Sequence, residues 1–206
     1  QINHYLYNGR KTNFDNYTVL IPGVGLGIDL LSIGFFLNKF KNCKIVCIDL
    51  SPTSLNICKK RLAKYNLNNI KIEINEMSLL DLDKTKHGLF DLIICVGVLH
   101  HLEDPSKGLN CLREVLKDDG GMYLMVYGKI GRTGIYQMQE LLKIVNKNLD
   151  ISDYQKKIEH FKQIYMMNGG LPINNWYKKS ENFIKWIPKE GDEEIVDLLL
   201  HCCDKS

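Results

Sequence analysis

The amino-acid sequence predicts an α/β fold, in which five mainly parallel strands form one sheet with helices on both faces. Short apolar runs rich in β-branched residues recur along the first part of the chain, and stretches with apolar residues at helical spacing separate them. The predicted strands are 17–22, 43–49, 70–75, 89–96 and 121–127. Because a strand–helix–strand repeat crosses over in a right-handed sense, we expect an open sheet.

Three helices are expected between the strands, at 27–40, 52–66 and 105–117. The last two begin with clear signals, since Ser51 and Asp104 each precede a proline, and this pair suits the N-cap and first turn of a helix. Two aspartates and two glycines at 118–121 are expected to end the third helix and turn the chain into the fifth strand.

The pattern changes after residue 128, where no further strand is predicted. Helices are expected at 133–147, 153–167 and 192–201. We therefore divide the chain into a ligand-binding core, 1–128, and a helical cap, 129–206, which we expect to be truncated at its C-terminus. A cap attached directly after the fifth strand is expected to cover the carboxyl edge of the sheet and exclude water from it.

The composition is that of a globular protein, because 45% of the 206 residues are hydrophobic and 25% are charged. No apolar run approaches the ~18 residues that cross a bilayer. No signal peptide opens the chain, although its first residue, Gln1, leaves room for a preceding targeting segment. We expect no membrane partner.

The seven cysteines are odd in number and include no CxxC pair, which argues against a disulfide framework or a zinc site. Five of them lie in or beside apolar runs: Cys43, Cys47, Cys58, Cys95 and Cys111. We expect reduced, buried thiols, a cytoplasmic location and no metal. The net charge of +3 includes no basic cluster interleaved with aromatic residues, so no nucleic-acid partner is expected.

The most specific local signal is VLIPGVGLG at 19–27, where a strand ends at Pro22 and three glycines lead into a helix. Such a turn lets the backbone approach a ligand closely, although taken alone it is equally compatible with a ligand-free turn. The third glycine comes one residue too early for a dinucleotide fingerprint, which disfavours pyrophosphate binding. Asp49, at the end of the second strand, is placed to accept the hydroxyls of a ribose.

Together with later motifs, this pattern resembles the class I S-adenosylmethionine-dependent methyltransferases over residues 17 to about 136. The later motifs are Phe90-Asp91, His100-His101-Leu102, Asp104-Pro105 and the Leu-Lys-x-x-Gly-Gly turn that begins at Leu116. The resemblance implies a Rossmann-like fold, S-adenosyl-L-methionine as the cofactor and S-adenosyl-L-homocysteine as the product. Two departures stand out: Ser78 occupies a position that is often Asp, and the sixth and seventh strands of the family are not predicted.

The resemblance, read with the convergence of the strand ends, also assigns site residues. Those assigned to the cofactor are Pro22, Gly23, Val24, Gly25, Gly27, Asp49, Leu50, Ser78, Leu79, Val96 and Gly97. The candidates for catalysis are His100, His101 and Tyr127, and those for the acceptor are Arg132 and Tyr136. Each histidine suits a general base near neutral pH, and equally a packing or capping role.

The predicted function is direct in-line transfer of a methyl group to a small-molecule or protein acceptor. The segment CVGVLHH after the fourth strand lacks the Asn/Asp-Pro-Pro-aromatic tetrad of amide methylation and the Pro-Cys nucleophile of cytosine C5 methylation. Two alternatives stay open: a nucleotide (NAD)-dependent oxidoreductase, favoured by the same glycines and Asp49, and a non-catalytic cofactor-binding scaffold module.

Overall fold

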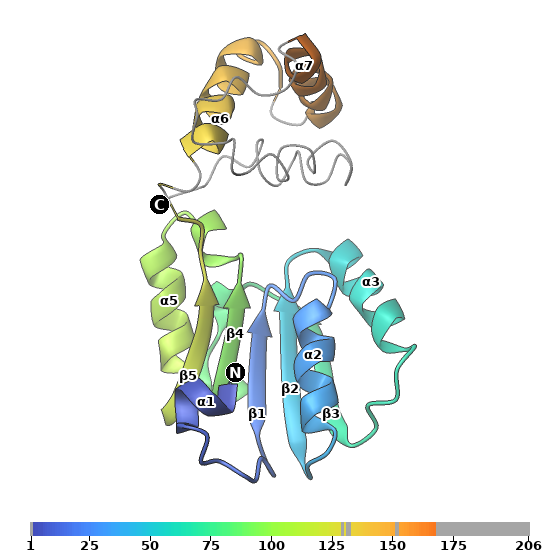
Figure 1. The fold of residues 1–206 in the computed structure, drawn as a ribbon, viewed down its shortest axis with the longest axis vertical. Helices are drawn as coiled ribbons and strands as arrows, with labels where there is room; N and C mark the ends of the chain where they lie inside the picture. The colour runs from blue at the N-terminus through green and yellow to red at the C-terminus, as the bar shows by residue number, and fades with distance from the viewer. Residues whose placement is uncertain (1, 129, 131–132, 151–152, 168–206) are drawn as a thin grey trace. The chain divides into compact units, whose positions relative to one another are not determined.

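The computed structural model describes residues 2–128, 130, 133–150 and 153–167 (Figure 1). Five strands form one parallel sheet in the order β3-β2-β1-β4-β5. The strands are β1 (Thr18–Pro22), β2 (Cys43–Asp49), β3 (Ile70–Glu76), β4 (Phe90–Val96) and β5 (Leu116–Met125). This confirms the predicted α/β fold. Because β1 lies in the middle and the chain builds outward first on one side and then on the other, the connecting helices cover both faces.

Four helices connect the strands, and the three that the sequence predicted begin within one residue of their predicted starts. The four helices are α2 (Ile28–Leu37), α3 (Pro52–Leu62), α4 (Lys84–His87) and α5 (Pro105–Glu114), with 3₁₀ turns η1 (Leu79–Asp81) and η2 (Leu99–His101). Ser51 caps α3 by accepting a hydrogen bond from Ser54 N at 3.2 Å, and Asp104 caps α5 by accepting one from Ser106 N at 2.9 Å. The N-terminal helix α1 (Ile2–Tyr7), α4 and the two turns were not predicted, because they are too short to show a repeating pattern.

Two apolar layers sandwich the sheet, because successive residues of a strand face opposite sides. One layer joins Val19 and Ile21 of β1 to Leu30 of α2 and Leu55 of α3. The other contains Leu20 of β1, together with side chains of η1, η2 and α5. In Figure 1, α1 and α2 lie in front of the sheet. Burial on both faces explains why β1, β2 and β4 are nearly continuous apolar runs, whereas the edge strand β3 alternates between apolar and polar residues.

The predicted boundary between the third helix and the fifth strand was wrong. The helix α5 ends at Glu114, and β5 takes in the segment 118–121 that was predicted as a turn. Phe90 pairs with Leu116 but Leu92 pairs with Gly121, so the intervening residues of β5 form an irregular bulge. The helix α5 ends earlier than predicted because Val115 is fully buried and the next residue, Leu116, already pairs with β4. The helices α2 and α3 likewise end earlier than predicted.

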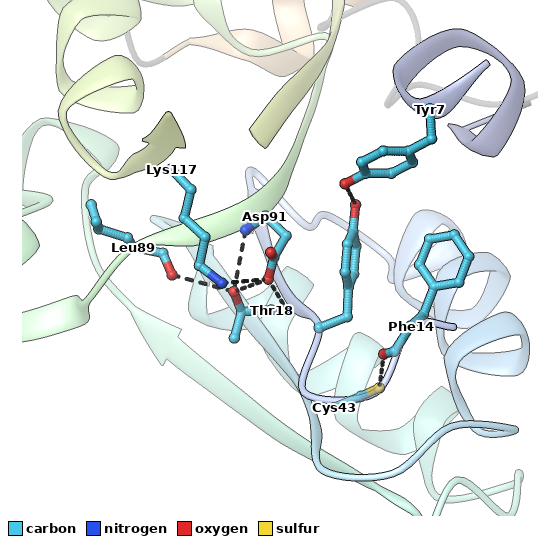
Figure 2. Close-up of polar contacts among 8 residues, drawn as sticks. Tyr7, Phe14, Thr18, Cys43, Leu89, Asp91 and Lys117 are labelled. Carbon is cyan, nitrogen blue, oxygen red and sulfur yellow. Dashed lines mark hydrogen bonds and ion pairs between the residues drawn. The ribbon is translucent and has the colours of Figure 1, made fainter. Parts of the chain in front are cut away.

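The amino ends of β1, β4 and β5 are tied together by one carboxylate (Figure 2). Asp91 Oδ2 accepts hydrogen bonds from Thr18 N at 2.8 Å and from Thr18 Oγ1 at 2.7 Å. The same oxygen lies 2.8 Å from Lys117 Nζ. Nearby, the hydroxyls of Tyr7 and Tyr17 are 2.7 Å apart and attach α1 to this end of the sheet. The Phe-Asp motif is therefore structural.

The chain divides after Val126 into two compact units. In the second unit, α6 (Thr133–Val145) and α7 (Tyr154–Met167) are the predicted helices, and both bury apolar side chains, among them Ile135, Met138, Leu142, Ile158 and Phe161. Among the described residues after 128, only helices occur. The predicted helix at 192–201 lies outside the described residues, and the role of this unit as a cap stays a prediction. In the part of the chain described, no helix is both long and apolar enough to span a membrane.

Candidate functional site

The carboxyl ends of β1, β2 and β4 lie side by side at one edge of the sheet, and a loop extends from each. The loop after β1 is central, because β1 pairs with both other strands. Four glycines in these loops have positive φ angles: Gly23 (67°), Gly25 (49°), Gly27 (82°) and Gly97 (73°). Backbone of this kind, at the carboxyl edge of an open parallel sheet, is where α/β proteins bind ligands.

The glycine loop is fastened to the neighbouring strand. Gly23 N and Val24 N both donate to Ile48 O of β2, at 2.8 and 3.1 Å. Gly27 N donates to Val24 O at 2.9 Å and closes the turn before α2. Pro22 and Val24 are themselves buried, and the N and O atoms of Val24 are both engaged in these hydrogen bonds. The protein's own hydrogen bonds therefore set the shape of the loop.

The three glycines of the loop differ in what surrounds them. A Cβ at Gly23 would collide with the side chain of Val98, and one at Gly27 would lie 2.7 Å from Cys58 Sγ. A Cβ at Gly25 would meet no atom within 4 Å. Gly23 and Gly27 are thus required by close packing within the protein. Gly25 alone presents open backbone, which is the cradle a closely approaching ligand needs.

Asp49 links two of the three loops. Its Oδ2 accepts a hydrogen bond from Gly25 N at 2.8 Å, and its Oδ1 accepts one from Ser51 N at 2.9 Å. The side chain is half-buried, and each carboxylate oxygen retains capacity for a further donor such as a ribose hydroxyl. The adjacent Leu50 is 68% exposed, an unusual exposure for a leucine that follows a buried strand. Asp49 and Leu50 therefore fit their predicted cofactor roles, which stay predictions.

The segment after β3 lies next to Asp49, because Met77 N donates to Asp49 O at 3.1 Å. Ser78 Oγ accepts a hydrogen bond from Leu80 N at 3.1 Å and thereby caps η1. The predicted cofactor residue Leu79 is only 6% exposed and its side chain belongs to the apolar core, whereas Leu80 is 37% exposed. Of the two leucines, Leu80 is therefore the one whose exposed surface a ligand could meet.

The loop after β4 carries the two histidines. Gly97 N donates to Met125 O at 3.0 Å, and His101 N donates to Val98 O at 3.0 Å, which closes η2. The imidazole rings of His100 and His101 have centroids 4.1 Å apart and are tilted by 56°. His100 is only 3% exposed, whereas His101 is half-buried. Of the two, His101 is the more exposed.

The remaining predicted site residues are distributed between the two units. Val96, at the end of β4, is half-buried at the carboxyl edge. Tyr127 and Tyr136 belong to the second unit and are both half-buried. Arg132 lies outside the described residues. The assignments of Tyr127, Arg132 and Tyr136 to the acceptor pocket stay predictions.

The thiols of the core are free and buried, as expected for Cys43, Cys47, Cys58 and Cys95, whereas Cys111 is half-buried. Burial raises the pKa of Cys95 to about 12, which keeps its thiol protonated and a poor nucleophile near neutral pH. This agrees with the exclusion of cysteine-dependent methylation. Among the described residues, no group of three or more His, Cys, Asp or Glu side chains is placed to hold a metal ion.

Sequence reasoning missed three residues at this edge: Cys58, Leu80 and Val98. The side chain of Cys58 lies close to Gly27, and that of Val98 lies close to Gly23. In both pairs the two residues are far apart in the sequence. No local pattern reveals such contacts. Leu80 was missed because the choice between two adjacent leucines depends on how η1 turns.

Together the sheet order and this edge define a Rossmann-like domain of the methyltransferase type. A family model described as a methyltransferase domain matches residues 23–122. This match supports the class I S-adenosylmethionine-dependent methyltransferase that the sequence predicted, with S-adenosyl-L-methionine as the cofactor that the resemblance implies.

Three individual proteins illustrate what the chain is similar to. An uncharacterized protein of Synechococcus sp. is 31% identical over 193 residues, which are 94% of this chain and 44% of that protein. The (S)-coclaurine N-methyltransferase of Papaver somniferum is 27% identical over 119 residues, or 58% of this chain and 32% of that enzyme. The structure of PKMT2 from Rickettsia typhi in complex with AdoHcy shares the fold, with a TM-score of 0.63 at 23% identity over 90% of this chain and 35% of that one.

This chain spans less than half the length of each of these three relatives. Nothing in the comparisons favours the alternative of a NAD-dependent oxidoreductase.

Proposed function

We propose that the chain transfers the methyl group of S-adenosyl-L-methionine directly to a small-molecule or protein acceptor. One observation carries the proposal: the open backbone at Gly25 is hydrogen-bonded to the carboxylate of Asp49. This pairing places a close-approach surface beside an acceptor of ribose hydroxyls, at the edge of the sheet from which the loop of His101 also extends.

The residues at this edge fit the cofactor. Asp49 would accept hydrogen bonds from the two ribose hydroxyls while it keeps its bonds to Gly25 N and Ser51 N. The exposed side chains of Leu50 and Leu80 offer apolar surface to the adenine, and the backbone near Ser78 offers polar groups to its edge. When bound, the cofactor supplies a methyl group that its sulfonium already activates, so the chain need only hold and align the two reactants.

The loop after β4 would serve the acceptor side of the reaction. We assign proton removal to His101 and a packing role to His100, because only His101 has an exposed portion large enough to meet an acceptor. Tyr127, Arg132 and Tyr136 are the residues that we propose for binding the acceptor. Replacing His101 with Ala should lower kcat by about a hundredfold and leave the affinity for S-adenosyl-L-homocysteine unchanged.

The acceptor class rests on the relatives, whose names include an alkaloid N-methyltransferase. The test is turnover: the protein is incubated with S-adenosyl-L-methionine and a panel of phenols, amines, carboxylic acids and cell proteins, and release of S-adenosyl-L-homocysteine is measured by mass spectrometry. We expect release that depends on one acceptor class and that is reduced in Asp49→Ala at cofactor concentrations below saturation. Binding of the cofactor without turnover on any acceptor would favour the scaffold module instead.

A further inference from the structure

The side chain of Val98 is in close contact with Gly23, at the start of the glycine loop. A Cβ at Gly23 would collide with one γ-methyl group of Val98 and lie 3.4 Å from the other. On its opposite side, Gly23 is held by the hydrogen bond from its N to Ile48 O. Gly23 is therefore held between β2 and Val98, and the loop cannot move toward β4 without moving Val98.

The backbone of Val98 belongs to the other side of the site. Its carbonyl oxygen accepts the hydrogen bond from His101 N that closes η2. The preceding residue, Gly97, has a φ of 73° and donates to Met125 O, which sets where the loop leaves β4. Val98 is thus one residue that touches the cofactor loop with its side chain and anchors the histidine turn with its backbone.

The type of side chain suits this position. Valine is branched at Cβ, so its χ1 angle is restricted and its two methyl groups hold a fixed direction. Val98 also packs against the apolar cluster that contains Leu99 and Leu112, and this packing holds its side chain in place. A rigid, supported side chain keeps the distance between two loops constant, whereas a longer flexible one would not.

We propose that Val98 is a positioning residue that holds the glycine loop in register with the loop of His101 and thereby sets the affinity for the methyl donor. This inference rests on the proposed function, because it takes the glycine loop as the cofactor site. Sub-ångström placement would matter there, since the cofactor would lie directly against the open backbone of Gly25.

The test compares two identical deletions in one apolar cluster. Val98 and Val115 both belong to it, but Val115 is at the other end of β4, where its carbonyl pairs with Phe90 N. Dissociation constants for S-adenosyl-L-homocysteine and melting temperatures are measured for the wild type, Val98→Ala, Val98→Thr and Val115→Ala. We expect Val98→Ala to raise Kd by about tenfold and the β-branched Val98→Thr to stay within about threefold of wild type.

Val115→Ala should lower the melting temperature at least as much as Val98→Ala and leave Kd unchanged, because Val115 is fully buried and does not contact the loop. If Val98→Ala does not fold, Val98→Leu replaces it, and its loss of β-branching should also weaken binding. Wild-type affinity in Val98→Ala, or in Val98→Leu where it takes that variant's place, would overturn the inference alone, as would equal weakening by Val115→Ala. A wild type that binds no S-adenosyl-L-homocysteine would overturn the proposed function and the inference with it.

Discussion

The two ends of the parallel sheet are built for different purposes. At the amino end, the carboxylate of Asp91 accepts hydrogen bonds from Thr18 and forms an ion pair with Lys117, so that three strands are joined (Figure 2). At the carboxyl end, Gly25 has no neighbour where its side chain would be, and Asp49 retains acceptor capacity. At the amino end, the polar groups form hydrogen bonds that stabilise the fold. At the carboxyl end, backbone atoms and a carboxylate stay accessible to a ligand. The first two tests below change the amino end, and the third changes the carboxyl end.

The largest effect is expected at the amino end. Replacing Asp91 with Ala removes three charge-assisted hydrogen bonds and leaves Lys117 without its partner, which should lower the free energy of unfolding by about 3 kcal/mol. Urea unfolding measures the loss. The matched control is Asp118→Ala, at an exposed aspartate that follows Lys117 in the sequence. Affinity for S-adenosyl-L-homocysteine should be unchanged; a lower affinity in Asp91→Ala would show that the two ends are not independent.

The same carboxylate predicts a pH dependence of stability. Burial alone would raise the pKa of Asp91, but hydrogen bonds from Lys117 and Thr18 outweigh it and leave that pKa below its usual value. A lowered folded-state pKa means that the stabilisation is present above pH ~4, the unfolded value, and is lost as the pH falls through the folded value. The difference in unfolding free energy between wild type and Asp91→Asn should therefore shrink with acid below pH ~4. A constant difference would contradict this.

At the carboxyl end, the expected effect falls on binding. Asp49→Ala should weaken binding of S-adenosyl-L-homocysteine by about 1.5–3 kcal/mol, because it removes the acceptor for the ribose hydroxyls and the link to Gly25 N. Titration calorimetry measures it, with Asp29→Ala in the first turn of α2 as the control. The fold should survive, since Asp49 is at a strand end. Unchanged affinity would refute the assignment of Asp49 to the ribose.

The smallest loss of stability is expected for Gly25→Ala, and it should differ from the loss for Gly27→Ala in the same loop. Gly25→Ala should cost only about 1 kcal/mol of stability, since its φ of 49° lies in the left-handed region and its Cβ enters open space. Its affinity for the cofactor should nevertheless fall, because the methyl group occupies the cradle. Gly27→Ala should destabilise the fold more, owing to Cys58 Sγ. Thermal melts with and without S-adenosyl-L-homocysteine distinguish them, and equal stability losses would contradict the contrast.

The sequence predicted most of the fold, because the information was local. The strands β1, β2 and β4 are apolar runs buried on both faces, and Ser51-Pro52 and Asp104-Pro105 mark the starts of α3 and α5. The boundary between α5 and β5 was predicted wrongly, since Lys117 and its neighbours follow the pairing with β4 rather than the helical pattern. Tertiary pairing overrode a local signal there.

The site was predicted in outline and not in detail. Glycines and an acidic residue at strand ends are visible in the sequence, and they lie together as expected. Which histidine is buried and which leucine of η1 is exposed depend on the geometry of 3₁₀ turns of three residues. The contacts of Val98 and Cys58 with the glycines join segments that are distant in the chain, and a single sequence carries no record of them.

Hydrogen exchange with and without S-adenosyl-L-homocysteine, read by mass spectrometry, tests the central claim most directly, because it reports on both ends of the sheet at once. We predict slower exchange on binding in the carboxyl-edge segments 22–27, 49–51, 78–80 and 97–101. Segments 14–18 and 89–91 at the amino end should be unaffected. Protection confined to the amino end, or protection that arises with NAD and not with S-adenosyl-L-homocysteine, would contradict the assignment of the carboxyl edge as the methyl-donor site.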